Sequence, residues 1–125
     1  MSETKFRAWD KENKEMCRVI GIHYDAEGKI EFVSVLTPRD TIHYIDVKDL
    51  LLLQFSGFHD RNGLEIYVGD IICWFVSQNI IGEVKFEGGS FIVANNTLEH
   101  FASNDIGVEV IGNIYQNSKL LEEKK

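Results

Sequence analysis

Short apolar runs, each followed by a turn signal, recur along the whole chain and constrain its fold more than any other feature. The longest of these runs are Leu50–Leu53 and Ile71–Val76. Runs of this length between turns are typical of β-strands, and they fall far short of the roughly 20 apolar residues that a membrane-spanning helix needs. The pattern therefore predicts an all-β protein.

The first 45 residues predict antiparallel hairpins. Asp25–Gly28 ends in a glycine, which can take the positive φ that a hairpin turn needs. Thr37–Asp40, which holds the only proline of the chain, ends another apolar run, and Gly21 is a candidate bulge. We expect strands over residues 4–9, 16–24, 29–36 and 41–45.

Residues 46–55 allow two interpretations. Asp46 could cap a helical turn, whereas the four leucines Leu50–Leu53 suit a buried helix and a buried strand equally well. We expect a helical turn over Asp46–Asp49 that leads into a strand over Leu51–Phe55.

In the second half, Asp60–Gly63 is a strong turn signal because its Asn-Gly pair supplies two residues that tolerate positive φ. We expect strands over residues 71–76, 80–86, 91–94 and 108–111. Short strands with tight turns suit a small, partly open barrel of the SH3-like type. The tail, residues 118–125, predicts a frayed helical turn.

The length of 125 residues fits one domain. Within this single domain, 1–125, we distinguish a hairpin region (1–53), a barrel-like region (54–117) and a tail (118–125). The predicted fold class is therefore all-β, with N-terminal antiparallel hairpins packed on a small SH3-like, partly open barrel and with short helical turns.

The charge balance bears on partners. Thirteen basic and twenty acidic side chains give a net charge of −7 at pH 7, which argues against tight, unspecific binding to nucleic acid. Met1–Lys5 opens no apolar stretch, so we expect no signal peptide, no membrane partner and a cytoplasmic protein. Cys17 and Cys73 stand alone, without a Cys-x-x-Cys spacing, and we expect both to be reduced core residues.

The histidines do not suggest a metal site. They lie far apart in sequence, whereas zinc sites usually show at least one close pair of ligands. The sequence also lacks a Gly-rich phosphate loop and a catalytic Cys-His pair at useful spacing. We therefore expect no metal and no cofactor. The four histidines are His23, His43, His59 and His100, and we interpret His23 and His43, which lie beside tyrosines in strands, as packing on a sheet surface.

Asp60, Glu65 and Asp70 fall within one stretch and form the candidate group for catalysis. Paired carboxylates can perform acid–base chemistry when their environments differ. Asp60, however, begins a turn, and Asp70 follows Gly69 just before a strand. Carboxylates at such positions accept backbone N–H groups, so we favour a structural role over a catalytic one.

Aromatic residues make up 11% of the chain and allow two interpretations. An aromatic surface beside arginine would suit single-stranded nucleic acid, and the candidates for it are Arg7, Trp9 and Arg61. Both arginines lie among acids, so we favour packing in the core and in a protein interface, where aromatics are enriched. The candidate contact residues are Phe55, Phe58, Arg61, Tyr67 and Tyr115.

Three blocks of the sequence are distinctive: FRAWD at Phe6–Asp10, QFSGFHDRNGLEIYVGDII at Gln54–Ile72, and VIGNIYQN at Val110–Asn117. Their order and spacing, over nearly the whole chain, resemble the YopX family of phage and prophage proteins. The resemblance implies a phage or integrated-prophage origin, a bacterial cytoplasm and homo-oligomers. It implies no activity.

We therefore expect a phage- or prophage-encoded accessory protein that binds protein, either further copies of itself or a host or phage protein. One alternative is a nucleic-acid-associated regulator of phage development that uses Arg7, Trp9 and Arg61. A less favoured alternative is an enzyme that uses the carboxylates of Asp60, Glu65 and Asp70.

Overall fold

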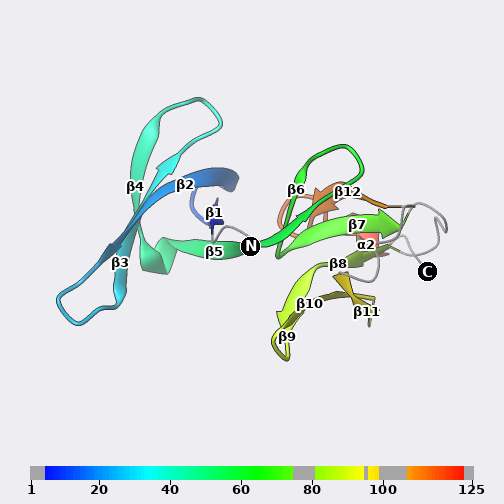
Figure 1. The fold of residues 1–125 in the computed structure, drawn as a ribbon. Helices are drawn as coiled ribbons and strands as arrows, with labels where there is room; N and C mark the ends of the chain where they lie inside the picture. The colour runs from blue at the N-terminus through cyan, green and yellow to red at the C-terminus, as the bar shows by residue number, and fades with distance from the viewer. Residues whose placement is uncertain (1–4, 75–80, 95, 99–106, 123–125) are drawn as a thin grey trace. The chain divides into compact units, whose positions relative to one another are not determined.

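The structure, a computed structural model, describes residues 5–74, 81–94, 96–98 and 107–122. The chain divides into two compact units. The N-terminal unit is Thr4–Gln54, and the second unit is Phe55–Lys125 together with Met1–Glu3. Most elements are strands in antiparallel sheets (Figure 1), which confirms the predicted all-β class. Within the described residues, no helix is long and apolar enough to cross a membrane.

The N-terminal unit is built from the predicted hairpins. Its strand order is β4-β3-β2-β1-β5, so β4 lies at an edge of the sheet. The register of β2 against β3 shifts between Val19 and Gly21, which confirms the predicted bulge. The elements are β1 (Phe6–Asp10), β2 (Glu15–Tyr24), β3 (Ile30–Leu36), β4 (Ile42–Asp46), the 3-10 helix η1 (Val47–Asp49) and the first half of β5 (Leu50–His59).

The ambiguous segment resolves into a helical turn followed by a strand, as predicted. The Asp46 carboxylate accepts the Lys48 N–H at 3.0 Å and caps η1. The strand that follows is longer than expected, because β5 continues past Phe55 to His59. Beyond Gln54 it pairs with β6 (Glu65–Tyr67) in the second unit.

One face of the N-terminal sheet forms the core of that unit. Successive side chains of a strand point to opposite faces, so a single face collects the apolar residues at alternate positions. The buried members are Ala8, Cys17, Val33, Val35 and Leu50, with Val19, Ile30, Ile45 and Leu52 packed against them. The side chains at the intervening positions of β2, β3 and β4 point to the opposite face of the sheet.

The second unit contains two three-stranded sheets, ordered β12-β7-β8 and β11-β10-β9. Its buried cluster is Ile66, Ile72, Val84, Val93, Leu98 and Val108. The described strands do not close into a barrel, and SH3-like connectivity stays a prediction. The elements are β7 (Asp70–Trp74), β8 (Ile81–Glu83), β9 (Lys85–Glu87), β10 (Ser90–Val93), β11 (Asn96–Thr97), β12 (Val108–Asn113) and the short α2 (Lys119–Glu122).

Three elements of the second unit differ from the prediction, and one of them is β11, where no strand was expected. The strand expected over residues 80–86 is two strands, β8 and β9, separated at Val84. This residue stays bonded to the segment at the start of β7: its N–H donates to the Asp70 carbonyl at 2.8 Å and its carbonyl accepts the Gly69 N–H at 2.9 Å. The three-residue strand β6 was not predicted. Residues 75 and 76 of the strand expected over 71–76 lie outside the described residues.

Three hairpins share one turn geometry. In the turn Asp25–Lys29, the first residue donates its N–H to the carbonyl of the fifth and accepts the N–H of the fourth. The same two bonds close Thr37–Thr41 and Asp60–Leu64. In each turn the first side chain also accepts the N–H groups of the third and fifth residues. The predicted turn signals thus produce one local structure three times.

The fourth residue of each turn has a positive φ, and it is Gly28, Asp40 or Gly63. The positive φ predicted for Gly28 is confirmed. Both residues of the Asn62-Gly63 pair tolerate a positive φ, and only Gly63 takes one. This three-residue loop needs a single left-handed residue, whereas a two-residue type I′ turn needs two.

Candidate functional site

The Asp60 carboxylate is buried and fully committed to backbone donors. Its Oδ1 accepts the N–H groups of Asn62 at 2.8 Å and Leu64 at 2.9 Å. Its Oδ2 accepts the N–H of Val110 at 3.0 Å. The side chain is 6% exposed. Asp60 therefore ties the hairpin turn to β12, as a structural carboxylate does.

The other two carboxylates of the predicted group also have local partners. Asp70, which is 1% exposed, accepts the Tyr67 N–H through Oδ2 at 2.8 Å. Glu65 accepts the Tyr67 hydroxyl at 2.9 Å. An open pocket of about 330 Å³ in the second unit is lined by other residues of β8, β9, β10 and α2. These contacts favour the structural interpretation.

The predicted contact aromatics lie in the second unit and differ in exposure. Phe55 is buried against the rings of His59 and Tyr67, at centroid distances of 5.6 and 5.5 Å. Phe58 packs against the hydrophobic cluster, Tyr115 is half-buried, and Arg61 is exposed in its turn. A role for these residues in binding stays a prediction.

The residues proposed for nucleic acid lie on different elements. Arg7 and Trp9 are in β1, and Arg61 is in the turn after β5. Trp9 is 9% exposed, which leaves little ring surface for stacking on a base. The nucleic-acid surface stays a prediction that the placement of Trp9 does not favour.

The described residues hold no group of three or more His, Cys, Asp or Glu side chains suited to a metal ion. Cys17 and Cys73 are both free thiols. Cys17 belongs to the N-terminal core and is 2% exposed. Burial, together with the nearby carboxylates of Glu15 and Asp10, raises the pKa of Cys17 to about 11.

Cys17 is expected to resist alkylation in the folded protein. At pH 8 a thiol of pKa about 11 is ionised about a hundredfold less than an ordinary one, and only the thiolate is nucleophilic. Brief treatment with iodoacetamide and peptide mass mapping should therefore modify the half-buried Cys73 first. In denaturant the two rates should converge, whereas equal rates in the native protein would contradict the assignment.

The most exposed large hydrophobic side chains of the N-terminal unit lie on β2 and β4. Tyr44 is 70% exposed and Ile42 is 56% exposed. Within the described residues β4 pairs only with β3, so its outer edge is open. Exposed edges present unpaired backbone groups that can pair with another chain, and proteins usually protect them with lysine or proline. The sequence of β4, IHYID, contains neither.

The direction of the backbone groups of β4 follows from its hairpin. Thr37 N–H donates to the Thr41 carbonyl at 2.8 Å, and hydrogen-bonded pairs alternate with non-hydrogen-bonded pairs along an antiparallel ladder. The next residue pairs are Leu36–Ile42 and, two steps further, Ser34–Tyr44. The N–H and carbonyl groups of Ile42 and Tyr44 therefore point away from β3, towards the open edge.

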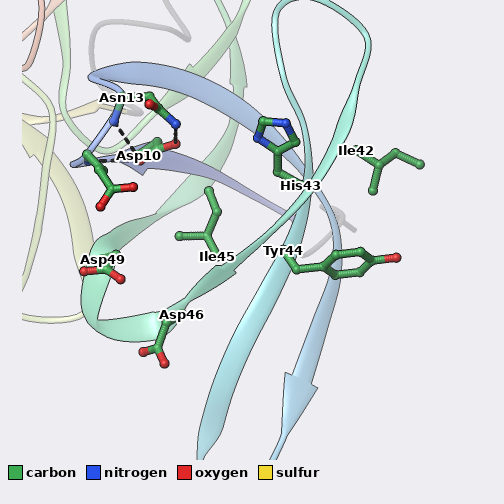
Figure 2. Close-up of a pocket in the computed structure, with 9 residues that line it drawn as sticks. Asp10, Asn13, Ile42, His43, Tyr44, Ile45, Asp46 and Asp49 are labelled. Atoms are coloured by element: carbon green, nitrogen blue, oxygen red, sulfur yellow. Dashed lines mark hydrogen bonds between the residues drawn. The ribbon is translucent and has the colours of Figure 1, made fainter.

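An acidic groove of about 440 Å³ runs along one side of β4. Figure 2 shows that Ile45 and His43 point to one side of the strand, and Ile42 and Tyr44 to the other. Four carboxylates line the groove and no lysine or arginine does, among the described residues. The acids are Asp10, Glu12, Asp46 and Asp49.

An aromatic row crosses the other face of the same three strands; we use this name for His23, Phe32 and Tyr44. The His23 and Phe32 rings stack with centroids 4.3 Å apart and planes 12° apart. The rings of Phe32 and Tyr44 form a T-shaped contact, with centroids 6.1 Å apart and planes 74° apart. These rings, with Glu31 and Asp46, line an open pocket of about 450 Å³. The pocket thus combines ring surfaces with two carboxylates.

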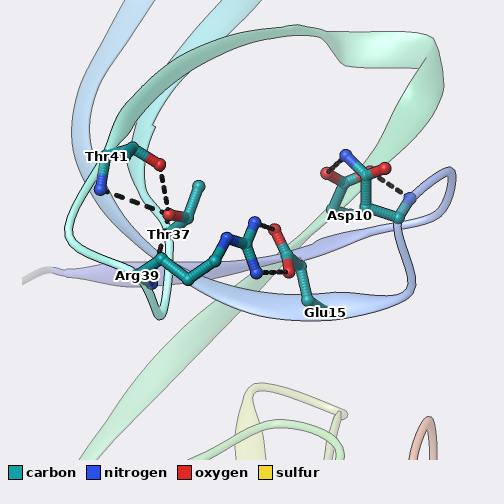
Figure 3. Close-up of polar contacts among 6 residues, drawn as sticks. Asp10, Glu15, Thr37, Arg39 and Thr41 are labelled. Carbon is teal, nitrogen blue, oxygen red and sulfur yellow. Dashed lines mark hydrogen bonds and ion pairs between the residues drawn. The ribbon is translucent and has the colours of Figure 1, made fainter.

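The turn before β4 is held by two polar contacts (Figure 3). Arg39 donates to both carboxylate oxygens of Glu15, at 2.9 and 3.0 Å, and so joins the turn to the start of β2. The hydroxyls of Thr37 and Thr41 hydrogen-bond at 2.6 Å. Exposed ion pairs stabilise by at most about 1 kcal/mol, so Arg39 connects the turn to β2 with little effect on stability.

Sequence reasoning placed His23 and His43 on a sheet surface but did not bring Phe32 and Tyr44 together. The Thr37–Thr41 turn contains the information needed to place them, because it sets the register of β3 against β4. Counting outward from the Thr37–Thr41 pair places residue 34 opposite 44 and residue 32 opposite 46. Phe32 and Tyr44 then become diagonal neighbours on one face, within reach of aromatic side chains.

Comparison with known proteins finds a matching family and similar solved structures. A family model described as "YopX protein" matches residues 5–122. The chain is also similar to protein EF1440 from Enterococcus faecalis, whose crystal structure aligns with a TM-score of 0.72 and 24% sequence identity, over 97% of this chain and 99% of that chain. At this identity the likeness shows the fold alone. No curated protein matches the chain.

Proposed function

The chain belongs to the YopX protein family, and from this premise, which names no reaction, we propose that the protein is a binding module that pairs an extended segment of a partner protein with β4. The observation that carries the proposal is the open edge of β4, with outward backbone groups at Ile42 and Tyr44. Strand addition of this kind gives affinity through main-chain hydrogen bonds and specificity through side-chain pockets.

Charge indicates what kind of segment fits. The groove and the aromatic pocket together are lined by five acids, Asp10, Glu12, Glu31, Asp46 and Asp49, of which Asp10 is buried and bonded to Glu12 and Asn13. No lysine or arginine lines either of them among the described residues. Complementary charge favours the encounter with the matching partner and disfavours others. The preferred segment is therefore extended and basic.

We propose a phage or integrated-prophage origin and action in the bacterial cytoplasm, as the family resemblance implies. The partner is then a host or phage protein, and a second copy of this chain is the other occupant that an open edge would accept. The proposed activity is binding and not catalysis, since Asp60 and Asp70 are occupied by backbone donors.

A proline at position 42 is expected to weaken binding without unfolding the protein. Ile42 directs its N–H to the open edge, where proline is tolerated because no ladder bond is lost. Peptides selected from a displayed library of random decapeptides should bind the Ile42→Pro variant at least about tenfold more weakly than wild type, the effect of losing one or two hydrogen bonds. Thermal unfolding should change little.

Two variants serve as controls. Ile42→Thr removes the apolar side chain but keeps the N–H, so it should retain most of the binding. His43→Pro removes an N–H that faces β3 and should lower the melting temperature. Equal affinity of selected peptides for wild type and Ile42→Pro would overturn the proposal. A dimer in sedimentation that Ile42→Pro dissociates would identify a second copy as the occupant.

A further inference from the structure

We propose that the aromatic row and its two carboxylates form a binding pocket for an arginine side chain of the partner segment. This inference rests on the proposed strand addition at β4 and deepens it. It assigns a chemical specificity to the face of the sheet that carries Ile42 and Tyr44.

The register places the pocket beside the segment that would pair with β4. His23 lies opposite Phe32, and Phe32 lies opposite Asp46, so three side chains form a line across β2, β3 and β4. Tyr44 is the next residue of β4 on the same face. A side chain from a strand added to β4 on that face would reach Tyr44 first and Phe32 behind it.

The rings are suited to a planar cation. Phe32 and Tyr44 both line the pocket with their ring planes at 74°, and Tyr44, which is 70% exposed, has an accessible ring surface. His23 is stacked on Phe32 and limits its movement, and the Ser34 hydroxyl lies 3.4 Å from His23 Nε2. Aromatic faces attract a guanidinium within about 6 Å of the ring centre, and arginine makes this contact more often than lysine.

The carboxylates have acceptor oxygens available for such a group. Asp46 uses Oδ1 to accept the Lys48 N–H at 3.0 Å, and its Oδ2 has no bonded partner among the described residues. The Glu31 carboxylate likewise makes no hydrogen bond or ion pair within the part of the chain that the structure describes. A guanidinium has five N–H donors in a planar fork, which matches acceptors placed around ring surfaces.

The test uses two peptide probes and the full chain labelled with ¹⁵N. The first probe is acetyl-Thr-Val-Arg-Val-Thr-amide, and the second carries citrulline, a neutral analogue of arginine with nearly the same shape, at the central position. We expect the arginine peptide to bind about tenfold more tightly, as a partly desolvated cation–aromatic contact with ion pairing would give. Its amide shift changes should centre on Phe32 and Tyr44.

Variants assign the preference to the pocket. Tyr44→Ala, and separately the double variant Glu31→Gln with Asp46→Asn, should reduce the arginine preference to less than about threefold. Asparagine caps helices as well as aspartate does, so the double variant keeps η1. Glu27→Gln, which removes an exposed acid of the β2–β3 turn, is the matched control and should leave the preference unchanged.

The outcomes separate the two proposals. If both probes bind equally and Ile42→Pro weakens both, strand addition stands and the arginine pocket is refuted. The pocket is also refuted if neither probe binds, or if the arginine preference survives in the double variant. Strand addition is then tested independently by the binding of the library-selected peptides. Preference lost only in the pocket variants supports both.

Discussion

Replacing Asp60 with alanine is expected to lower the free energy of unfolding of the second unit by about 3 kcal/mol, because buried N–H groups that lose a charged acceptor cost about 1–3 kcal/mol each. The Asp60 carboxylate accepts three N–H groups, and the one from Val110 lies fifty residues away in sequence. Removing the carboxylate leaves two N–H groups of the turn and one N–H group of β12 without their acceptor.

Urea unfolding followed by the fluorescence of Trp74 measures the effect. Each unit holds one of the two tryptophans, so a Trp9→Phe background isolates the signal of the second unit. Asp25→Ala is the matched control, because it removes the same two bonds within a turn. Among the described residues, the Asp25 carboxylate makes no hydrogen bond to a distant strand. We expect it to cost about 1 kcal/mol. Equal costs at both positions would contradict a tertiary role for Asp60.

Gly69→Ala is expected to destabilise the second unit by a similar amount. The glycine has a φ of +94°, and an added Cβ would lie 2.9 Å from Tyr115 Cε2. Its N–H donates to the Val84 carbonyl and its carbonyl accepts the Ile114 N–H, so the backbone is held on both sides. A left-handed alanine costs about 1–2 kcal/mol, and overpacking adds about 1–3 kcal/mol.

Gly89→Ala separates these two contributions. Gly89 has a φ of +83° with nothing within 4 Å of a built Cβ, so only the backbone cost applies. We expect about 1 kcal/mol for it, against about 3 kcal/mol for Gly69. Adding Tyr115→Ala to Gly69→Ala should recover part of the difference in a double-mutant cycle. Equal costs for the two glycine variants would show that Tyr115 moves aside freely.

Local chemistry accounts for what could be predicted from the sequence. The turns that begin at Asp25 and Asp60 form because an acid can accept the N–H groups of the two following alternate residues and because a glycine stands in fourth place. The cap at Asp46 forms for the same reason. These bonds span at most four residues, so the local sequence carries the information.

Long-range contacts account for the rest. The break between β8 and β9 falls at Val84, which bonds to Gly69 and Asp70, fourteen or fifteen residues earlier. The strand β6 exists because β5 lies beside it, since three residues alone have little preference for strand. Nothing near these segments in the sequence signals either contact.

The position of the candidate site also depends on contacts between strands. The sequence predicted contact residues around Phe58, but Phe58 packs against the core. The aromatic row lies instead on β2, β3 and β4, where alternation sends Phe32 and the exposed Tyr44 to the face opposite the core. A register derived from the Thr37–Thr41 turn, and not aromatic content, is the information that locates them.

The course of β5 determines how the protein can be divided into fragments for expression. Its residues Leu50–Gln54 pair with β1, and its residues Phe55 and His59 pair with β6. The boundary between the units therefore falls inside a hydrogen-bonded strand and not in a linker. A fragment that stops at Gln54 or starts at Phe55 would end in half a ladder, so shorter expression fragments should overlap, each carrying the whole of Leu50–His59.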